Sequence, residues 1–183
     1  MHGGLMTGWG QAIYTSWTMV ADRDNVIVVF PNAHRRRLWT LEASDREKLA
    51  EKDLPEELRQ NHANPTPEDN HDIKFVFALL EKIKQKYNID EERIFMQGMS
   101  NGSMFTTQFE KYFGNILAGA SGAGGSILNL RQFFDKDWKP VNTAGAVPVW
   151  ESKPELNGMP PWCEFDEPTT YKYGRLYWQE ING

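Results

Sequence analysis

The residues with the clearest chemical potential are Gly98-Met99-Ser100-Asn101-Gly102. They match the pattern G-x-S-x-G, in which a serine lies on a sharp turn between a strand and a helix and its hydroxyl acts as a nucleophile. Here the apolar run 94–97 leads directly into the motif, and residues 101–112 follow it with the pattern of a helix. This context predicts that Ser100 is a catalytic nucleophile. The alternative is a glycine-rich turn with an incidental serine.

The two glycines of the motif have a steric explanation. A side chain at position 98 or 102 would collide with the neighbouring strand and helix, and glycine has no Cβ atom to make that collision. The helix that begins after Ser100 directs backbone N–H groups toward the site, where they stabilise developing negative charge. The motif therefore predicts acyl-transfer chemistry with a serine nucleophile.

A second short motif, His2-Gly3-Gly4, is of the kind that supplies a backbone N–H to an oxyanion hole. The predicted oxyanion donors are the amides of Gly4 and Leu5 together with the amide of Asn101, the residue after the nucleophile. His2 is expected to be structural and not a base. The alternative is that this tripeptide is a tail with no role in the site.

Apolar periodicity places both motifs in an alternation of helices and strands. The expected helices cover residues 9–22, 72–87, 101–112 and 169–181, and the expected strands cover residues 26–30, 93–97, 116–120 and 147–150. Ile13, Trp17 and Val20 can share one face of the first helix, and the run 26–30 (VIVVF) is typical of a strand buried on both faces. The alternation predicts an α/β fold with a mostly parallel sheet flanked by helices. Residues 1–183 are expected to form one domain with a polar surface excursion at about 40–70, including a short helix near residues 45–52.

The composition excludes several classes of protein. The chain has 183 residues, a formal net charge of −5, seven Trp, ten Phe and six Tyr, so it is neither disordered nor suited to a nucleic acid partner. The basic cluster 35–37 is expected to be a solvated loop, with a binding patch as the alternative. No apolar run is long enough for a bilayer, and no signal peptide is visible. The sequence predicts no metal or organic cofactor. Its single cysteine is Cys163, so it has no CxxC motif, and it has neither a histidine pair at ligand spacing nor a GxGxxG motif after a strand.

The order of several segments resembles that of a family of esterases. These segments are the run HGG, a Trp-containing helix, VIVVFPN, Trp39, a helix that starts with Asp72, and NIDEERIFMQGMSNGSM (88–104). The family is that of the polyhydroxybutyrate-depolymerase-like and feruloyl-esterase-like α/β hydrolases. The resemblance covers about residues 2–125. It implies an α/β-hydrolase-like fold, a secreted protein, and hydrolysis of carboxylic esters, those of polymers included (polyester, feruloyl or acetyl esters).

The resemblance also implies a Ser–Asp–His triad in that chain order. The triad acid is expected shortly after the strand 147–150, where this sequence has Glu155 and Asn157. Glu155 is either that acid or a solvated loop residue, since a carboxylate is what a triad histidine needs. All four histidines precede Ser100: His2, His34, His62 and His71. The base is therefore expected beyond Gly183, with His71 as a weaker alternative, and sheet strands are expected to be missing at both ends of the chain.

Two classes of function remain open. The first is a serine esterase that works through an acyl-enzyme on Ser100, with acyl transfer to another acceptor as a variant of the same chemistry. The second is a truncated or degenerate hydrolase-fold protein without catalysis. It would bind a polysaccharide or a protein partner through aromatic residues such as Trp150, Trp162 and Tyr171. The sequence makes no prediction of oligomeric state.

Overall fold

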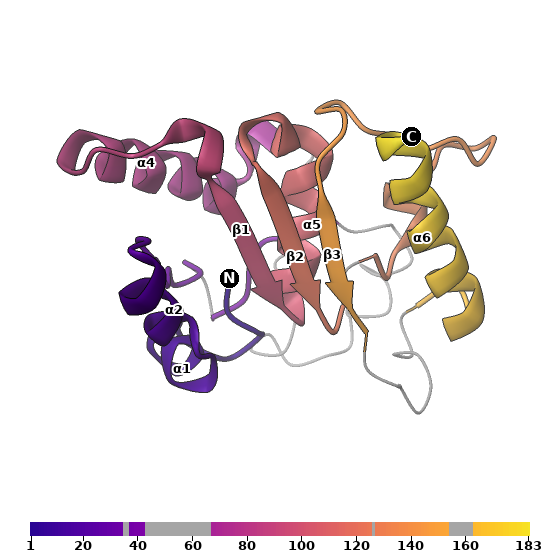
Figure 1. The fold of residues 1–183 in the computed structure, drawn as a ribbon. Helices are drawn as coiled ribbons and strands as arrows, with labels where there is room; N and C mark the ends of the chain where they lie inside the picture. The colour runs from indigo at the N-terminus through magenta and orange to yellow at the C-terminus, as the bar shows by residue number, and fades with distance from the viewer. Residues whose placement is uncertain (35–36, 43–66, 126, 154–162) are drawn as a thin grey trace.

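The structure is a computed structural model that describes residues 1–34, 37–42, 67–125, 127–153 and 163–183. Its centre is a parallel sheet of three strands in the order β1-β2-β3, and helices flank this sheet (Figure 1). The expected α/β class with a parallel sheet is confirmed at this level. The expected short helix near residues 45–52, inside the polar excursion, lies outside the described residues.

The strands are β1 (Phe95–Met99), β2 (Gly119–Ala123) and β3 (Val149–Ser152). Gly98 of β1 pairs with Gly122, which in turn pairs with Glu151 of β3. Each strand begins two or three residues later than the sequence predicted. For β1 and β2 the cause is local: the short 3₁₀ turns Glu91–Arg93 and Gly114–Ile116 take up the residues in front of them.

Three of the four expected helices are confirmed. They are α4 (His71–Lys86), α5 (Asn101–Phe113) and α6 (Glu167–Asn182). Asn70 caps α4, because its Oδ1 accepts the amides of Asp72 and Ile73 at 3.0 and 3.2 Å. Asp166 caps α6 in the same way, by accepting the amide of Thr169 at 2.8 Å. These side chains satisfy donors that a helix start otherwise leaves unpaired.

The prediction of one helix over 9–22 is wrong, since the segment forms α1 (Gly8–Tyr14) and α2 (Trp17–Asp24). The break is at Thr15, which leaves helical geometry while its N–H and its hydroxyl both donate to the carbonyl of Gln11. A β-branched residue with a hydroxyl competes in this way with the next helical hydrogen bond. The expected apolar face is not buried either, as Ile13 is 69% exposed.

The prediction of a buried strand over 26–30 is also wrong. The segment follows α2 without strand pairing, and Val26, Ile27 and Val29 are all exposed. A strand forms only where a neighbour completes its hydrogen bonds, and among the described strands β1 pairs with β2 alone. The sheet therefore has three strands where four were expected.

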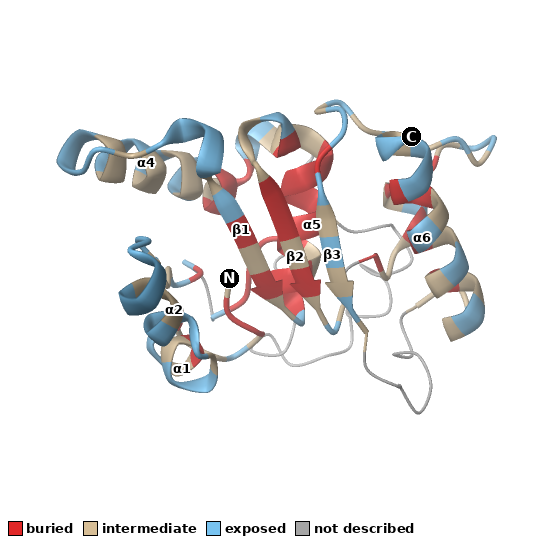
Figure 2. Cartoon of the chain, in the orientation of Figure 1, coloured by how far each residue is buried: buried red, intermediate tan, exposed pale blue. Residues whose placement is uncertain are grey.

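Burial changes from residue to residue along the strands (Figure 2), because neighbouring side chains of a strand lie on opposite faces of the sheet. Met96 and Ala120 point toward α5 and are buried, whereas Phe95 and Trp150 on the opposite face are 67% and 75% exposed. One core lies around Trp39, Phe105 and neighbouring apolar residues of α5, and a second lies around Ile127, Phe133 and Tyr177 against α6. None of the described helices combines the length and the apolar character needed to cross a bilayer.

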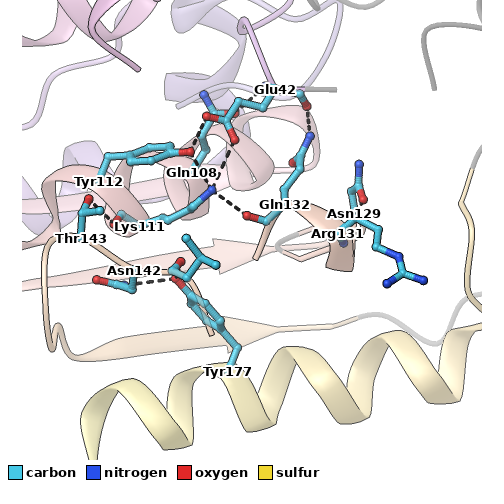
Figure 3. Close-up of polar contacts among 11 residues, drawn as sticks. Glu42, Gln108, Lys111, Tyr112, Asn129, Arg131, Gln132, Asn142, Thr143 and Tyr177 are labelled. Carbon is cyan, nitrogen blue, oxygen red and sulfur yellow. Dashed lines mark hydrogen bonds and ion pairs between the residues drawn. The ribbon is translucent and has the colours of Figure 1, made fainter. Parts of the chain in front are cut away.

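A polar network fastens Glu42 to the C-terminal part of α5 (Figure 3). Lys111 Nζ lies 3.4 Å from Glu42 Oε2 and donates to the carbonyl of Gln132 at 2.6 Å, while Tyr112 donates its hydroxyl to Glu42 Oε1 at 2.5 Å. Lys111 is eleven residues beyond Ser100, or about 16 Å along the helix at 1.5 Å per residue. The network therefore holds Glu42, near the start of the polar excursion, against α5. It is distant from the serine motif.

Candidate nucleophile site at the carboxyl end of the sheet

Ser100 follows the last residue of β1 and precedes the first residue of α5. Its backbone has φ 51° and ψ −119°, a combination outside the regions that a residue with a side chain ordinarily adopts. The Ser100 N–H donates to the carbonyl of Ala123 at 2.7 Å, and its carbonyl accepts the amides of Ser103 and Met104 at 2.9 and 3.0 Å. These bonds to β2 and α5 hold a conformation that costs about 1–3 kcal/mol. The side chain at the bend is exposed.

The prediction that a side chain at position 98 or 102 would collide is confirmed, but at position 102 the collision is with the first residues of the chain and not with the neighbouring strand or helix. A Cβ atom on Gly98 would lie 2.1 Å from the carbonyl oxygen of Gly102, and one on Gly102 would lie 2.4 Å from the carbonyl oxygen of His2. Both contacts are with backbone, which has no side chain to rotate away. Residues 98 and 102 must therefore be glycine for the strand, the bend and the helix to approach as closely as they do.

The segment His2-Gly3-Gly4 lies against this bend. Met99 donates its N–H to the carbonyl of Met1 at 3.2 Å, so the chain starts alongside the end of β1. A Cβ atom on Gly3 would lie 3.6 Å from the Met99 carbonyl oxygen, and one on Gly4 would lie 3.6 Å from Cβ of Asn101. The two glycines thus contact the residues on both sides of Ser100. The structure brings together the two motifs that the sequence singled out.

The predicted use of the Leu5 amide requires correction. Leu5 donates its N–H to the carbonyl of Arg37 at 2.9 Å, so this donor is engaged within the protein. The reason is the turn itself, in which Met6 donates to the carbonyl of Gly3 and Leu5 takes a φ of 63° that aims its amide at Arg37. The amide of Gly4 has no acceptor among the described residues. Gly4 is therefore the donor that this turn leaves for a ligand.

Asn101 links the bend to the segment around Trp39, a contact that the sequence did not predict. Its Oδ1 accepts the N–H of Trp39 at 2.7 Å, and the indole of Trp39 donates to the carbonyl of His2 at 2.9 Å. Trp39 is fully buried and stacks on Phe105 of α5 at 5.0 Å between ring centroids. The main-chain amide of Asn101 begins α5, where backbone N–H groups favour negative charge.

His2 has the structural role that the sequence predicted. Its Nε2 accepts the N–H of Ala33 at 3.0 Å, which requires the proton on Nδ1, and Nδ1 donates to the carbonyl of Gly3 at 2.7 Å. Burial lowers the pKa of His2 below its ordinary value, so the neutral ring is favoured. Both ring nitrogens are engaged with backbone, and the ring fixes the turn that carries Gly4.

No histidine contacts Ser100 within the described parts of the chain. His71 Nε2 lies 3.1 Å from the hydroxyl of Thr40, and the neighbouring Asp72 is fully buried, where it accepts the amides of Thr40 and His34. These hydrogen bonds hold α4 against the residues on both sides of Trp39, namely His34 and Thr40. His62 and the proposed acid Glu155, together with Asn157 and Trp162, lie outside the described residues. Over the described ranges, no set of three or more His, Cys, Asp or Glu side chains is grouped to hold a metal ion.

Leu38 and Arg37 lie beside the Gly4 turn, a position that the sequence did not predict for either residue. A Cβ atom on Gly4 would lie 3.0 Å from Leu38 Cδ2, and Arg37 accepts the Leu5 amide as described above. The cluster 35–37 was expected to be a solvated loop, with a binding patch as the alternative. Arg37 is exposed, which fits both, and residues 35–36 lie outside the described residues. The sequence held no signal for the position of Arg37, because hydrogen bonding between Leu5 and Arg37 depends on the fold.

Comparisons of the chain with protein-family models, with curated proteins and with solved structures give no significant match.

Proposed function

We propose that the protein is a serine carboxylic ester hydrolase of the α/β-hydrolase type, with Ser100 as the nucleophile. The observation that carries the proposal is the backbone of Ser100, held at φ 51° between a parallel strand and a helix with its side chain exposed. Strained residues of this kind cluster at functional sites. The resemblance of residues 2–125 to esterases of polymer esters agrees with this geometry.

In the proposed reaction the Ser100 hydroxyl attacks the ester carbonyl carbon and transfers its proton to a base. The negative charge that forms on the carbonyl oxygen is stabilised by the amides of Gly4 and Asn101, which flank the serine. The proton then passes to the departing alcohol as the tetrahedral intermediate collapses to an acyl-enzyme. Water releases the acid and regenerates Ser100. A histidine supported by a carboxylate is the base that this chemistry requires, and Glu155 remains the proposed carboxylate.

The direct test is covalent labelling. A fluorophosphonate probe should modify Ser100 in the wild-type protein, identified by mass spectrometry of the peptide that contains it, and 4-nitrophenyl acetate should be hydrolysed. Ser100→Ala should lose both properties. Ser152→Ala is the matched control, because Ser152 is an exposed serine at the end of β3. Labelling or hydrolysis that persists in Ser100→Ala would remove this proposal.

A second candidate is a non-catalytic protein that binds polysaccharide. The observation in its favour is Trp150, which is 75% exposed on the open face of the sheet and is free to stack on a sugar ring. Tyr171, also named for this role, is half-buried and lies under Lys153 Nζ at 4.7 Å from its ring centroid. Affinity electrophoresis in gels with and without xylan discriminates the candidates: retardation that Trp150→Ala abolishes, in a protein inert to the fluorophosphonate, favours binding over catalysis.

A further inference from the structure

Left-handed backbone is concentrated around the turn that faces Ser100. Among the described residues, five non-glycine residues have a positive φ: Leu5, Asn25, Arg37, Ser100 and Trp138. Three of the five, Leu5, Arg37 and Ser100, lie around Gly4. The Leu5 N–H donates a hydrogen bond to the Arg37 carbonyl. Gly4 lies next to Asn101, which follows Ser100, and next to Leu38, which follows Arg37. Such conformations persist only where the surrounding structure holds them, and they mark functional sites.

Arg37 is the charged member of this group. Its φ is 58° and its carbonyl accepts the Leu5 amide, so its backbone is fixed beside the turn that carries Gly4. The residue is exposed and forms no ion pair with a carboxylate in the described parts of the chain. Asp72, the buried carboxylate of this region, already accepts two backbone amides. Among the described residues, no carboxylate therefore neutralises the positive charge of Arg37.

The positive charge of Arg37 acts on the pKa of His2, the residue that fixes the turn. Burial is the main cause that lowers the pKa of His2. The hydrogen bond with Gly3 and the charge of Asp72 raise this pKa, whereas the positive charges of the N-terminus and, as the smallest effect, of Arg37 lower it. An anionic group bound over Gly4 would lie in the same field. A guanidinium recognises a carboxylate in a planar, two-pronged geometry that a neutral ester cannot match.

We infer that Arg37 gives the Ser100 site a preference for esters that carry a carboxylate near the scissile bond. The inference rests on the proposed function, whose substrate class it narrows. Arg37 is a specificity-determining residue and not part of the bond-breaking machinery. The esters that fit are half-esters of dicarboxylic acids or esters of acidic sugars and hydroxy acids.

The kinetic test uses two substrates of equal acyl length, 4-nitrophenyl butyrate and mono-4-nitrophenyl succinate. In the wild-type protein kcat/KM should favour the succinate ester, and Arg37→Gln should reduce the ratio of the two kcat/KM values about tenfold. Glutamine keeps a side chain at the same left-handed φ, so the backbone strain is matched. Arg175→Gln, an exposed arginine on α6, is the control and should leave the ratio unchanged. Equal ratios in wild type and Arg37→Gln would overturn the inference.

A binding test separates this inference from the proposed function, because it needs no catalysis. Monomethyl succinate and dimethyl succinate are titrated into Ser100→Ala protein, and the amide NMR shifts of Gly4 and Asn101 are followed. Monomethyl succinate should bind about tenfold more weakly when Arg37→Gln is added, whereas dimethyl succinate should be unaffected. If these binding results are found but the wild-type protein hydrolyses no ester, the proposed esterase function is refuted and the inference about Arg37 still holds. Equal binding of the two compounds, or binding of neither, would refute the inference.

Discussion

The main-chain N–H of Ser100 donates to the carbonyl oxygen of Ala123 across 2.7 Å. This bond joins the residue after β1 to the last residue of β2, so the parallel pairing of the two strands continues one residue beyond β1. The strained bend is therefore anchored in the sheet and not only in the helix that follows. Because the sheet fixes the backbone, the side chain of Ser100 projects at a defined position above the carboxyl ends of the strands.

The strain at Ser100 predicts an unusual order of stability for two variants. Ser100→Gly and Ser100→Ala both remove the hydroxyl, but only glycine adopts a φ of 51° without steric cost. We expect Ser100→Gly to be more stable than Ser100→Ala by about 1 kcal/mol, even though glycine has the more flexible unfolded chain. Urea denaturation followed by circular dichroism measures the difference. Equal stability, or a more stable alanine variant, would contradict the observed backbone.

A larger effect is expected at Gly98. The added methyl group of Gly98→Ala would lie 2.1 Å from the Gly102 carbonyl oxygen, which belongs to tightly held backbone. We expect a loss of about 3 kcal/mol or more in the free energy of unfolding, since overpacking in a rigid site forces backbone shifts. Labelling of Ser100 by the fluorophosphonate should fall in parallel, because the bend cannot keep its geometry.

Gly10→Ala is the matched control for Gly98→Ala. Gly10 lies within α1, and its added Cβ atom would meet nothing closer than the Thr7 hydroxyl at 3.4 Å. Alanine in an exposed helix is more favourable than glycine by up to about 1 kcal/mol. The control should therefore be as stable as the wild type or more stable. A comparable loss in both variants would show that the clash at Gly98 is relieved without cost.

The buried carboxyl of Glu110 predicts a specific dependence of stability on pH. Burial, and then the nearby charge of Glu151, raise the pKa of Glu110 well above its ordinary value of 4.5. Between that ordinary value and the raised one, the folded protein keeps a proton that the unfolded chain releases. The free energy of unfolding therefore decreases as pH rises through this window. Lys153, which pairs with Glu151 at 3.2 Å, and the buried Tyr177 are the other titratable groups of this region.

Glu110→Gln isolates this contribution, because glutamine keeps the shape of the side chain and has no proton to lose. Its stability relative to the wild type should rise with pH above about 4.5, measured by urea denaturation at a series of pH values. Glu180→Gln, an exposed glutamate on α6, is the control and should show no such trend. A constant difference between Glu110→Gln and the wild type would mean that Glu110 titrates as it does in water.

The pair Lys111 and Glu42 predicts strong coupling between two variants. Lys111 is almost fully buried, and burial lowers its pKa while Glu42 opposes this change. Glu42→Gln leaves a desolvated ammonium without its carboxylate and should cost about 3 kcal/mol. The double variant Glu42→Gln with Lys111→Met should lose less than the sum of the single variants, in a cycle of urea denaturation measurements. The pair Lys84 and Glu91, whose side chains are 23% and 67% exposed, is the control, and its cycle should show weaker coupling.

The parts of the fold that rest on neighbouring residues could be predicted from the sequence. The helices α4 and α5 were predicted within one residue at each end, because the apolar stripe that marks each helix lies within the segment itself. The bend at Ser100 was predicted for the same reason: its two glycines lie two residues away on either side. The structural role of His2 also followed from its place in the turn.

Other features depend on residues that are distant in the chain. The run 26–30 has the composition of a buried strand, but a strand needs a neighbour, and none of the described strands pairs with it. Likewise, the continuous periodicity of 9–22 did not reveal the break at Thr15, which a local hydroxyl bond creates. Composition records a preference for a conformation, whereas the partner that satisfies the backbone decides whether it forms.

The sequence by itself determined which residue is the candidate nucleophile, from the pattern of five residues around it. The need for glycine is local at position 98, where a Cβ atom would meet Gly102, and tertiary at position 102, where it would meet His2. Only the tertiary structure decided which amides remain for a ligand. The carbonyl of Arg37 accepts the amide of Leu5, whereas the amide of Gly4 has no acceptor among the described residues. That choice rests on hydrogen bonds between segments far apart in the chain, and a local pattern of residues does not contain them.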